Sequence, residues 1–166
     1  MQTSIAHTDV DPTAFLDLYN RRIVADGAAD MNAPIIADFR ANSGPTGVFT
    51  GAPILLLTTT GAKSGQPRTA PVVYTREGDR YIVLASRAGA PLHPAWYHNV
   101  VANPTATVEL GEQRFSVACS FPQGQQREQL LAQHLATLPD QLRELMQGYQ
   151  QQTTRPFPVV VLERVS

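Results

Sequence analysis

The chain has 166 residues, 43% of them hydrophobic, and this size fits one globular domain with an apolar core. A formal net charge of -1 provides no basic face of the kind that binds nucleic acid, so we expect no nucleic-acid partner. Cys119 is the only cysteine, which excludes an intrachain disulfide and, without a signal-peptide pattern, indicates a cytoplasmic protein. No apolar run approaches the roughly 18–20 residues of a transmembrane helix, so any membrane contact would be peripheral.

The N-terminal part of the chain predicts two helices, at residues 12–24 and 33–41. In the first, Phe15, Leu18 and Tyr19 recur at helical spacing, and Pro12 suits a first helical turn. The second, "APIIADFRA", is also amphipathic. We expect the apolar sides of both helices to pack against the domain, because basic residues do not dominate their polar faces as they do in helices that lie on membranes.

Six later segments have the composition of β-strands: residues 54–60, 69–76, 80–86, 105–110, 113–121 and 157–165. A short helix is expected at 93–103, and helical spacing returns after Gly124 and again after Pro139. The connections are short, and strands do not alternate regularly with helices. The sequence therefore predicts a mainly β, α+β fold, an antiparallel barrel with helices in its N-terminal part and C-terminal half, and not a doubly wound sheet.

The turn "GAKSGQPR" contains Lys63, the only lysine of the chain, with Arg68 just beyond it. It lacks the spacing of a nucleotide P-loop, in which the lysine follows the second glycine. The ingredients are still those of an anion site: glycines allow the amides of residues 61–65 to converge, Ser64 adds a hydroxyl, and the two cations supply charge. The alternative is a solvated hairpin tip.

Two other candidate chemistries are not supported by the sequence. His93 and His98 are five residues apart, a spacing that predicts different sides of a helix, and we expect no metal site. Cys119 has no histidine nearby in the sequence, which argues against a catalytic thiolate.

Three motifs, "LLLTTTGAKSGQPRTAPVVY", "YIVLASRAGAPLHPAWYHNVVANP" and "TRPFPVVVLERV", occur in an order and spacing similar to the deazaflavin-dependent nitroreductase family of actinobacteria. The resemblance covers roughly residues 31–165. It implies a split β-barrel, related to the flavin-binding barrels, for residues 31–166, preceded by a helical extension over 1–30. It also implies that the cofactor is coenzyme F420, a 5-deazaflavin whose tail carries a phosphodiester and several glutamates.

The resemblance assigns cofactor-binding residues to this sequence. The anionic tail would be held by Thr60, Gly61, Lys63, Ser64, Gly65 and Arg68. Backbone groups of Pro71, Val72 and Val73 would bond the pyrimidine part of the ring, and Ser86, Arg87, Ala88 and Gly89 would lie against phosphate and ring. Arg87 stands where many relatives have lysine. Ala95 and Trp96 would flank the ring, although a tryptophan at such a position is, by itself, more often part of a core.

The activity that the resemblance implies is hydride transfer from reduced F420 to a small electrophile, such as an enone, quinone, nitro-aromatic or unsaturated ring. Tyr149 falls near tyrosines that line the substrate side in relatives and is the candidate catalytic residue; the alternative is that Tyr149 only packs and water supplies the proton. Two rival functions remain: an FMN or FAD reductase on the same barrel, and a non-catalytic protein that binds F420 or a hydrophobic metabolite. We expect a homodimer.

Overall fold

In the part of the chain that the computed structural model describes, residues 28–45, 51–85, 93–151, 153–154 and 156–165, six antiparallel strands close into a barrel. The strands are β1 (Ile54–Thr60), β2 (Pro67–Glu77), β3 (Arg80–Leu84), β4 (Thr105–Leu110), β5 (Gln113–Ser120) and β6 (Val159–Arg164). They pair in the order β1-β2-β3-β6-β5-β4, and β4 pairs back with β1. The predicted α+β barrel and its six strands are confirmed.

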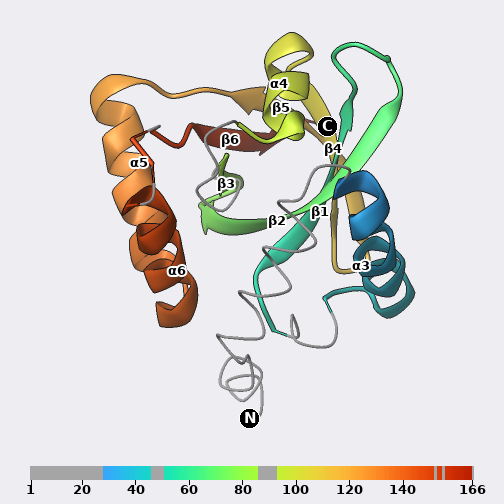
Figure 1. The fold of residues 1–166 in the computed structure, drawn as a ribbon, viewed down its shortest axis with the longest axis horizontal. Coiled ribbons are helices and arrows are strands. Elements are labelled where there is room, and N and C mark those ends of the chain that lie inside the picture. The colour runs from blue at the N-terminus through green and yellow to red at the C-terminus, as the bar shows by residue number, and fades with distance from the viewer. Residues whose placement is uncertain (1–27, 46–50, 86–92, 152, 155, 166) are drawn as a thin grey trace.

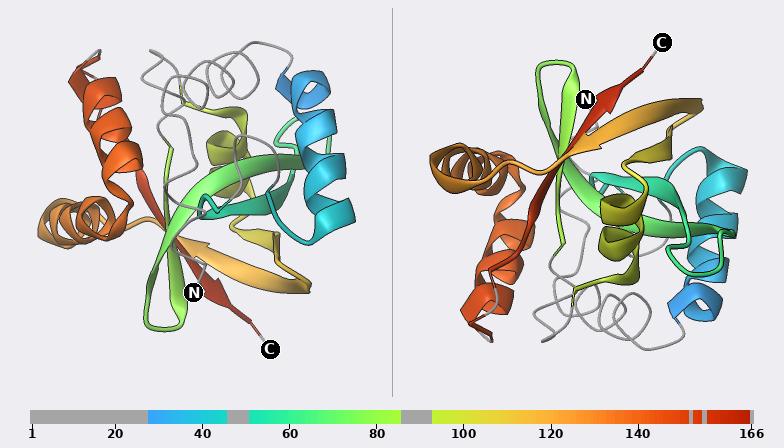
Figure 2. Two further views of the ribbon diagram at one scale, coloured as in Figure 1. Left: turned by 90° about the horizontal axis from the view of Figure 1, so that it is seen from below. Right: turned by 90° about the horizontal axis from the view of Figure 1, so that it is seen from above.

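Four helices of the described residues surround this barrel: α3 (Ala28–Asn42), α4 (Ala95–Ala102), α5 (Gly124–Thr137) and α6 (Asp140–Gln151). Helices α5 and α6 lie together on one side of the barrel, and α3 lies on the opposite side (Figures 1 and 2). No helix among the described residues has the length and apolar character needed to cross a membrane.

Only one of the two helices predicted in the N-terminal part of the chain falls within the described residues. The predicted helix at 33–41 is the C-terminal part of α3, which already begins at Ala28 and includes Pro34. The predicted helix at 12–24 lies outside the described residues. The boundary that the sequence suggested between residues 30 and 31 falls within α3, and the division into an extension and a barrel domain stays a prediction.

Alternating side chains give the strands an inner and an outer face. In β5, Phe115, Val117 and Cys119 are buried, whereas Arg114 before them and Ser116 between the first two are exposed. This period-2 pattern places the apolar side chains inside the barrel. Two hairpins, β2–β3 and β4–β5, turn at glycines with φ of 60°, a conformation that favours glycine.

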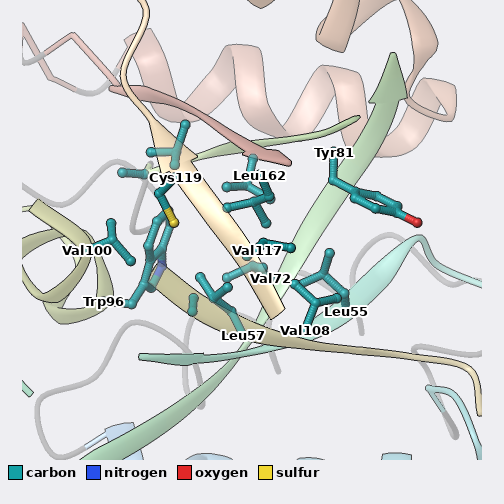
Figure 3. Close-up of a cluster of buried hydrophobic side chains, with 14 of the residues drawn as sticks. Leu55, Leu57, Val72, Tyr81, Trp96, Val100, Val108, Val117, Cys119 and Leu162 are labelled. Atoms are coloured by element: carbon teal, nitrogen blue, oxygen red, sulfur yellow. The ribbon is translucent and has the colours of Figure 1, made fainter. Parts of the chain in front are cut away.

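The barrel interior is filled by one apolar cluster, part of which is drawn in Figure 3. Its buried members come from all six strands and from α4: Leu55, Leu57, Val72, Tyr81, Val83, Ala85, Trp96, Val100, Ala106, Val108, Phe115, Val117, Cys119, Val160 and Leu162. Helix α4 takes part through Trp96 and Val100, so its position is fixed by the barrel core. That position matters because α4 also contacts the turn that follows β1.

A second cluster covers the outer face of β1 and β2. Ile54 and Val73 belong to it, whereas their neighbours Leu55 and Val72 point into the barrel. Residues from α6, Met146 and Tyr149 among them, and from the chain before β6 complete the cluster. A third, smaller cluster forms where α5 covers β3 and β6. The two C-terminal helices thus stabilise the barrel from outside.

Candidate anion-binding site

The turn between β1 and β2 presents the two predicted cations to solvent. The β1–β2 register runs to the pair Thr60 and Pro67, which leaves residues 61–66 as the turn. Lys63, Ser64 and Arg68 are all exposed. Strand β2 starts at Pro67, two residues before its predicted start, so Arg68 lies within the strand and its backbone is held by the ladder.

Hydrogen bonds within the turn give it a defined shape. The amide of Gly61 donates to the Gln66 carbonyl at 2.8 Å, and the amide of Gly65 donates to the Gly61 carbonyl at 2.9 Å. The Gln66 amide donates to Ser64 Oγ at 3.1 Å. Gly65 has a φ of 71°, in the left-handed region, and a Cβ on Gly61 would lie only 2.5 Å from Ser64 Oγ. The backbone of the turn therefore favours glycine at both positions.

The same hydrogen bonds correct one expectation. The sequence predicted that the amides of residues 61–65 converge on a ligand, but the amides of Gly61, Ala62 and Gly65 donate hydrogen bonds to other groups of the protein. Among the described residues, only the amides of Lys63 and Ser64 in this stretch donate no hydrogen bond. The anion-binding groups of the turn are thus two neighbouring amides, the Ser64 hydroxyl and two side-chain cations.

Asn99, on the buried face of α4, holds the turn in place. Its Oδ1 accepts a hydrogen bond from the Ala62 amide at 2.9 Å, and its Nδ2 donates to Thr59 Oγ1 at 3.0 Å. Sequence reasoning missed this residue. A signal was present, because Asn99 shares the helix face of Trp96 and Val100, where a polar side chain must find buried partners.

The strand segment beside the turn pairs with β1, whereas its pairing with β3 among the described residues starts later. Val72 pairs with Leu55 of β1, and Pro71 pairs with Leu56. On its other side, β2 pairs with β3 only from Tyr74 onward. Among the described strands, the edge of β2 that includes Pro71, Val72 and Val73 therefore has a ladder partner on one side only. The predicted ring-binding backbone groups belong to this segment.

The second predicted segment is only partly described. Ser86, Arg87, Ala88 and Gly89 lie outside the described residues. Ala95 is exposed at the start of α4, whereas Trp96 is 8% exposed and lies in the barrel cluster with Cys119 and Val100 (Figure 3). Most of the indole thus has the core role that the sequence left open, and contact between Trp96 and a ring stays a prediction.

Tyr149 lies on the outer side of the barrel wall. Its side chain is 2% exposed and belongs to the cluster that includes Ile54, Val73 and Phe157. Val73 is also a residue of the predicted ring-binding strand. The tyrosine therefore packs near that strand, on the face opposite the barrel interior, and its catalytic role stays a prediction.

The histidine pair and the cysteine, for which the sequence predicted neither a metal site nor a catalytic thiolate, lie as follows in the structure. The rings of His93 and His98 have centroids 5.8 Å apart, so the prediction that they lie on different sides of a helix is wrong. The reason is that His93 precedes α4, which begins at Ala95, and helical spacing does not apply to it. Among the described residues, no three His, Cys, Asp or Glu side chains are grouped to hold a metal. Burial raises the pKa of Cys119 to about 11, so its thiol is protonated at neutral pH.

Comparisons with known proteins place these features in one group. A family model described as F420H(2)-dependent quinone reductase matches residues 35–164. An F420H(2)-dependent quinone reductase of Mycobacterium tuberculosis H37Rv is 39% identical over 130 residues, which are 77% of this chain and 86% of that protein. A solved F420-H2 dependent reductase is 36% identical with a TM-score of 0.56, over 67% of this chain and 94% of that chain. Another solved structure, described as a domain-swapped dimer, is 31% identical with a TM-score of 0.57, and the match covers 92% of this chain and 100% of that chain.

Proposed function

The chain belongs to the family of F420H(2)-dependent quinone reductases, and from this membership we propose that it transfers hydride from reduced F420 to a quinone-like acceptor. The match over residues 35–164 carries the proposal, because it includes the cationic turn, the barrel and the C-terminal helices. The resemblance to F420-dependent reductases that the sequence indicated is thereby confirmed. The acceptor classes beyond quinones, nitro-aromatics included, stay predictions.

The turn fits the anionic tail of F420. Lys63 is exposed within the turn, and Arg68 is exposed in β2 just after it. The amides of Lys63 and Ser64, which donate no hydrogen bond to the described residues, lie in the same turn. A charge-assisted hydrogen bond contributes about 1.5–3 kcal/mol, so several together suffice to hold a phosphodiester. Thr60, Gly61 and Gly65 would shape the backbone around it.

The edge of β2 and the start of α4 would receive the ring. Backbone groups of Pro71–Val73 lie next to the turn in sequence, on a strand with one described ladder partner there. Ala95 and the exposed edge of Trp96 would flank the ring, and Ser86–Gly89 complete the proposed site. This arrangement would place the tail at the tip of the hairpin and the ring along its strand.

F420H2, when bound, supplies the hydride, and the residues of this chain would orient it, exclude water and handle the proton. The strands beneath the proposed ring site are apolar on both faces, with Val72 inside the barrel and Val73 outside. A dry wall strengthens hydrogen bonds to charge that develops on the acceptor. We retain Tyr149 as the proposed donor to the acceptor oxygen, with water as the alternative.

Two titrations and one assay test the proposal. The protein is mixed with F420 and, separately, with FMN, and binding is followed by fluorescence. Reduced F420 is then supplied anaerobically with a water-soluble quinone, and its oxidation is followed by absorbance. Tight F420 binding with quinone-dependent oxidation is expected. Preference for FMN would point to a flavin reductase, and F420 binding without turnover over a panel of quinones, enones and nitro-aromatics would point to a carrier; either result contradicts the proposal.

The assembly and location of the protein form part of the same proposal. We propose a homodimer, supported by the similar structure described as a domain-swapped dimer, and light scattering after size-exclusion chromatography measures it directly. A cytoplasmic location with at most peripheral membrane contact rests on the sequence. Flotation with liposomes would test the membrane contact.

A further inference from the structure

Asn99 joins α4 to the β1 end of the cationic turn, residues 61–66. On one side its Oδ1 accepts from the amide of Ala62, the residue before Lys63. On the other side its Nδ2 donates to Thr59 Oγ1, and Thr59 pairs with Arg68 across the ladder, its Oγ1 lying 3.5 Å from the Arg68 carbonyl. One side chain, 7% exposed, thus contacts the residue before one cation and the partner of the other.

We propose that Asn99 is a positioning residue for anion binding: it fixes the turn so that the amides of Lys63 and Ser64 and the Arg68 side chain face one anion together. This inference rests on the proposed function. Asn99 would not touch the cofactor, because its donor and acceptor groups are directed at Thr59 and Ala62. Its effect on binding would pass entirely through the backbone of the turn.

The energetics favour this role over packing alone. Asn99 shares its helix face with Trp96 and Val100, and the surrounding cluster is apolar. An aliphatic side chain of similar size would fill this volume without the desolvation cost of an amide. What an amide adds is a donor and an acceptor on one rigid group, which matches the hydroxyl of Thr59 and the N–H of Ala62 at the β1 end of the hairpin tip.

The turn has few other constraints from outside. Within the described residues, its remaining hydrogen bonds, among Gly61, Ser64, Gly65 and Gln66, are internal and would move with it as a unit. Loss of the Asn99 contacts would therefore leave a folded turn that the β1–β2 ladder still holds at its base but that is no longer fixed to α4. Ordering such a turn on binding costs affinity, which is the expected phenotype.

The test measures two ligands, F420 and the tail-less deazaflavin chromophore that lacks phosphate and glutamates. Asn99→Leu should raise the Kd for F420 about tenfold, the equivalent of one net hydrogen bond, and should leave the Kd for the tail-less chromophore within about twofold. Thr59→Val should act in the same direction, and Thr59→Ser, which keeps the hydroxyl, should restore wild-type affinity. Any kcat measured at saturating F420H2 should be unchanged, with the effect in KM.

Thr75→Val is the matched control, because Thr75 is also a buried, hydrogen-bonded threonine of a barrel strand but contacts His134 instead of the turn. It should lower stability without changing the Kd for F420. In addition, Asn99→Leu combined with Lys63→Ala should lose clearly less affinity than the product of the two single losses, since both changes disable the same turn.

Three results would overturn the inference: equal weakening of F420 and of the tail-less chromophore, multiplicative losses in the double variant, or wild-type F420 affinity in folded Asn99→Leu and Thr59→Val. If Asn99→Leu does not fold, Thr59→Val and Thr59→Ser decide alone. Failure of the proposed function is distinct, because then the wild-type protein would itself not bind F420.

Discussion

His134 of α5 and Thr75 of β2 form a buried hydrogen bond, with Nδ1 and Oγ1 2.6 Å apart. His134 is 1% exposed, and burial lowers the pKa of its imidazole to about 4 from the ordinary value of 6.5. The ring is therefore neutral at pH 7 and joins the C-terminal helices to the barrel wall without a buried charge.

The depressed pKa of His134 predicts a stability that falls as the pH drops. Between pH 6.5 and pH 4 the unfolded chain binds a proton at this histidine and the folded chain does not, so the free energy of unfolding decreases as the pH falls through this window. A shift of this size corresponds to roughly 3 kcal/mol, since one pKa unit equals about 1.4 kcal/mol. Urea unfolding at several pH values between 4 and 7 measures the slope.

Replacing both partners isolates the contribution of His134. The double variant Thr75→Val, His134→Leu substitutes an apolar pair and leaves no buried polar group without a partner. The free energy of unfolding of this double variant should depend less on pH between pH 4 and pH 6.5 than that of the wild type. The stability that is lost in acid through carboxylates should remain; Glu109 is one of them, since its hydrogen bond with Arg40 lowers its pKa. An unchanged slope in the double variant would assign the pH dependence to other groups.

Removing either cation of the turn should weaken F420 binding in a salt-sensitive way. Lys63→Ala and Arg68→Ala should each raise the Kd roughly tenfold or more, the equivalent of one charge-assisted hydrogen bond. The difference from wild type should shrink at about 1 M salt, where the Debye length is only about 3 Å. Fluorescence titration over a salt series measures both effects. Arg143→Ala, which removes a half-buried cation of α6 that pairs with Asp140, is the control, and a loss as large in that variant would contradict a local role.

The two glycines of the turn should differ in what they tolerate. Gly65 has a left-handed φ of 71° and open space around it, so Gly65→Asn should be mild and Gly65→Val costly, because asparagine adopts this region and a β-branched residue does not. Gly61→Ala should weaken F420 binding, since its Cβ would meet Ser64 Oγ and, at 3.2 Å, the Gln66 carbonyl. Urea unfolding and F420 titration separate the two effects. Gly148→Ala, in open helical surroundings, should instead be stabilising by up to about 1 kcal/mol.

The barrel could be predicted because its strands carry local signals. β1 is a run of apolar and β-branched residues, and β5 alternates buried and exposed side chains. The helix over 33–41 was predicted too short at its start, because α3 already begins at Ala28 and continues through Pro34. Strand β2 was also predicted too short at its start; it begins at Pro67, since a strand start tolerates a residue without an amide hydrogen.

The cations of the site could also be predicted from the sequence, but the residues and hydrogen bonds that hold the turn in place could not. Lys63 and Arg68 stand out by charge, whereas Asn99 acts across 37 residues through its bond to Ala62. Which amides of the turn remain for a ligand depends on hydrogen bonds that only the folded backbone defines. The prediction for His93 failed for the same reason: helical spacing applies only within α4, and its start at Ala95 was not known from the sequence.

Tyr149→Phe tests the proposed proton donor. If the hydroxyl donates to the acceptor oxygen as hydride arrives, this change should lower kcat with a quinone at least about tenfold, the lower range for general acid catalysis, and leave the Kd for F420 within about twofold. Tyr74→Phe is the matched control, because Tyr74 is a half-buried tyrosine of β2 that stacks edge-on against Tyr81. Stopped-flow oxidation of reduced F420 in H2O and D2O measures kcat and its solvent isotope effect. An unchanged kcat in Tyr149→Phe would mean that Tyr149 only packs against Ile54 and Val73, and that water supplies the proton.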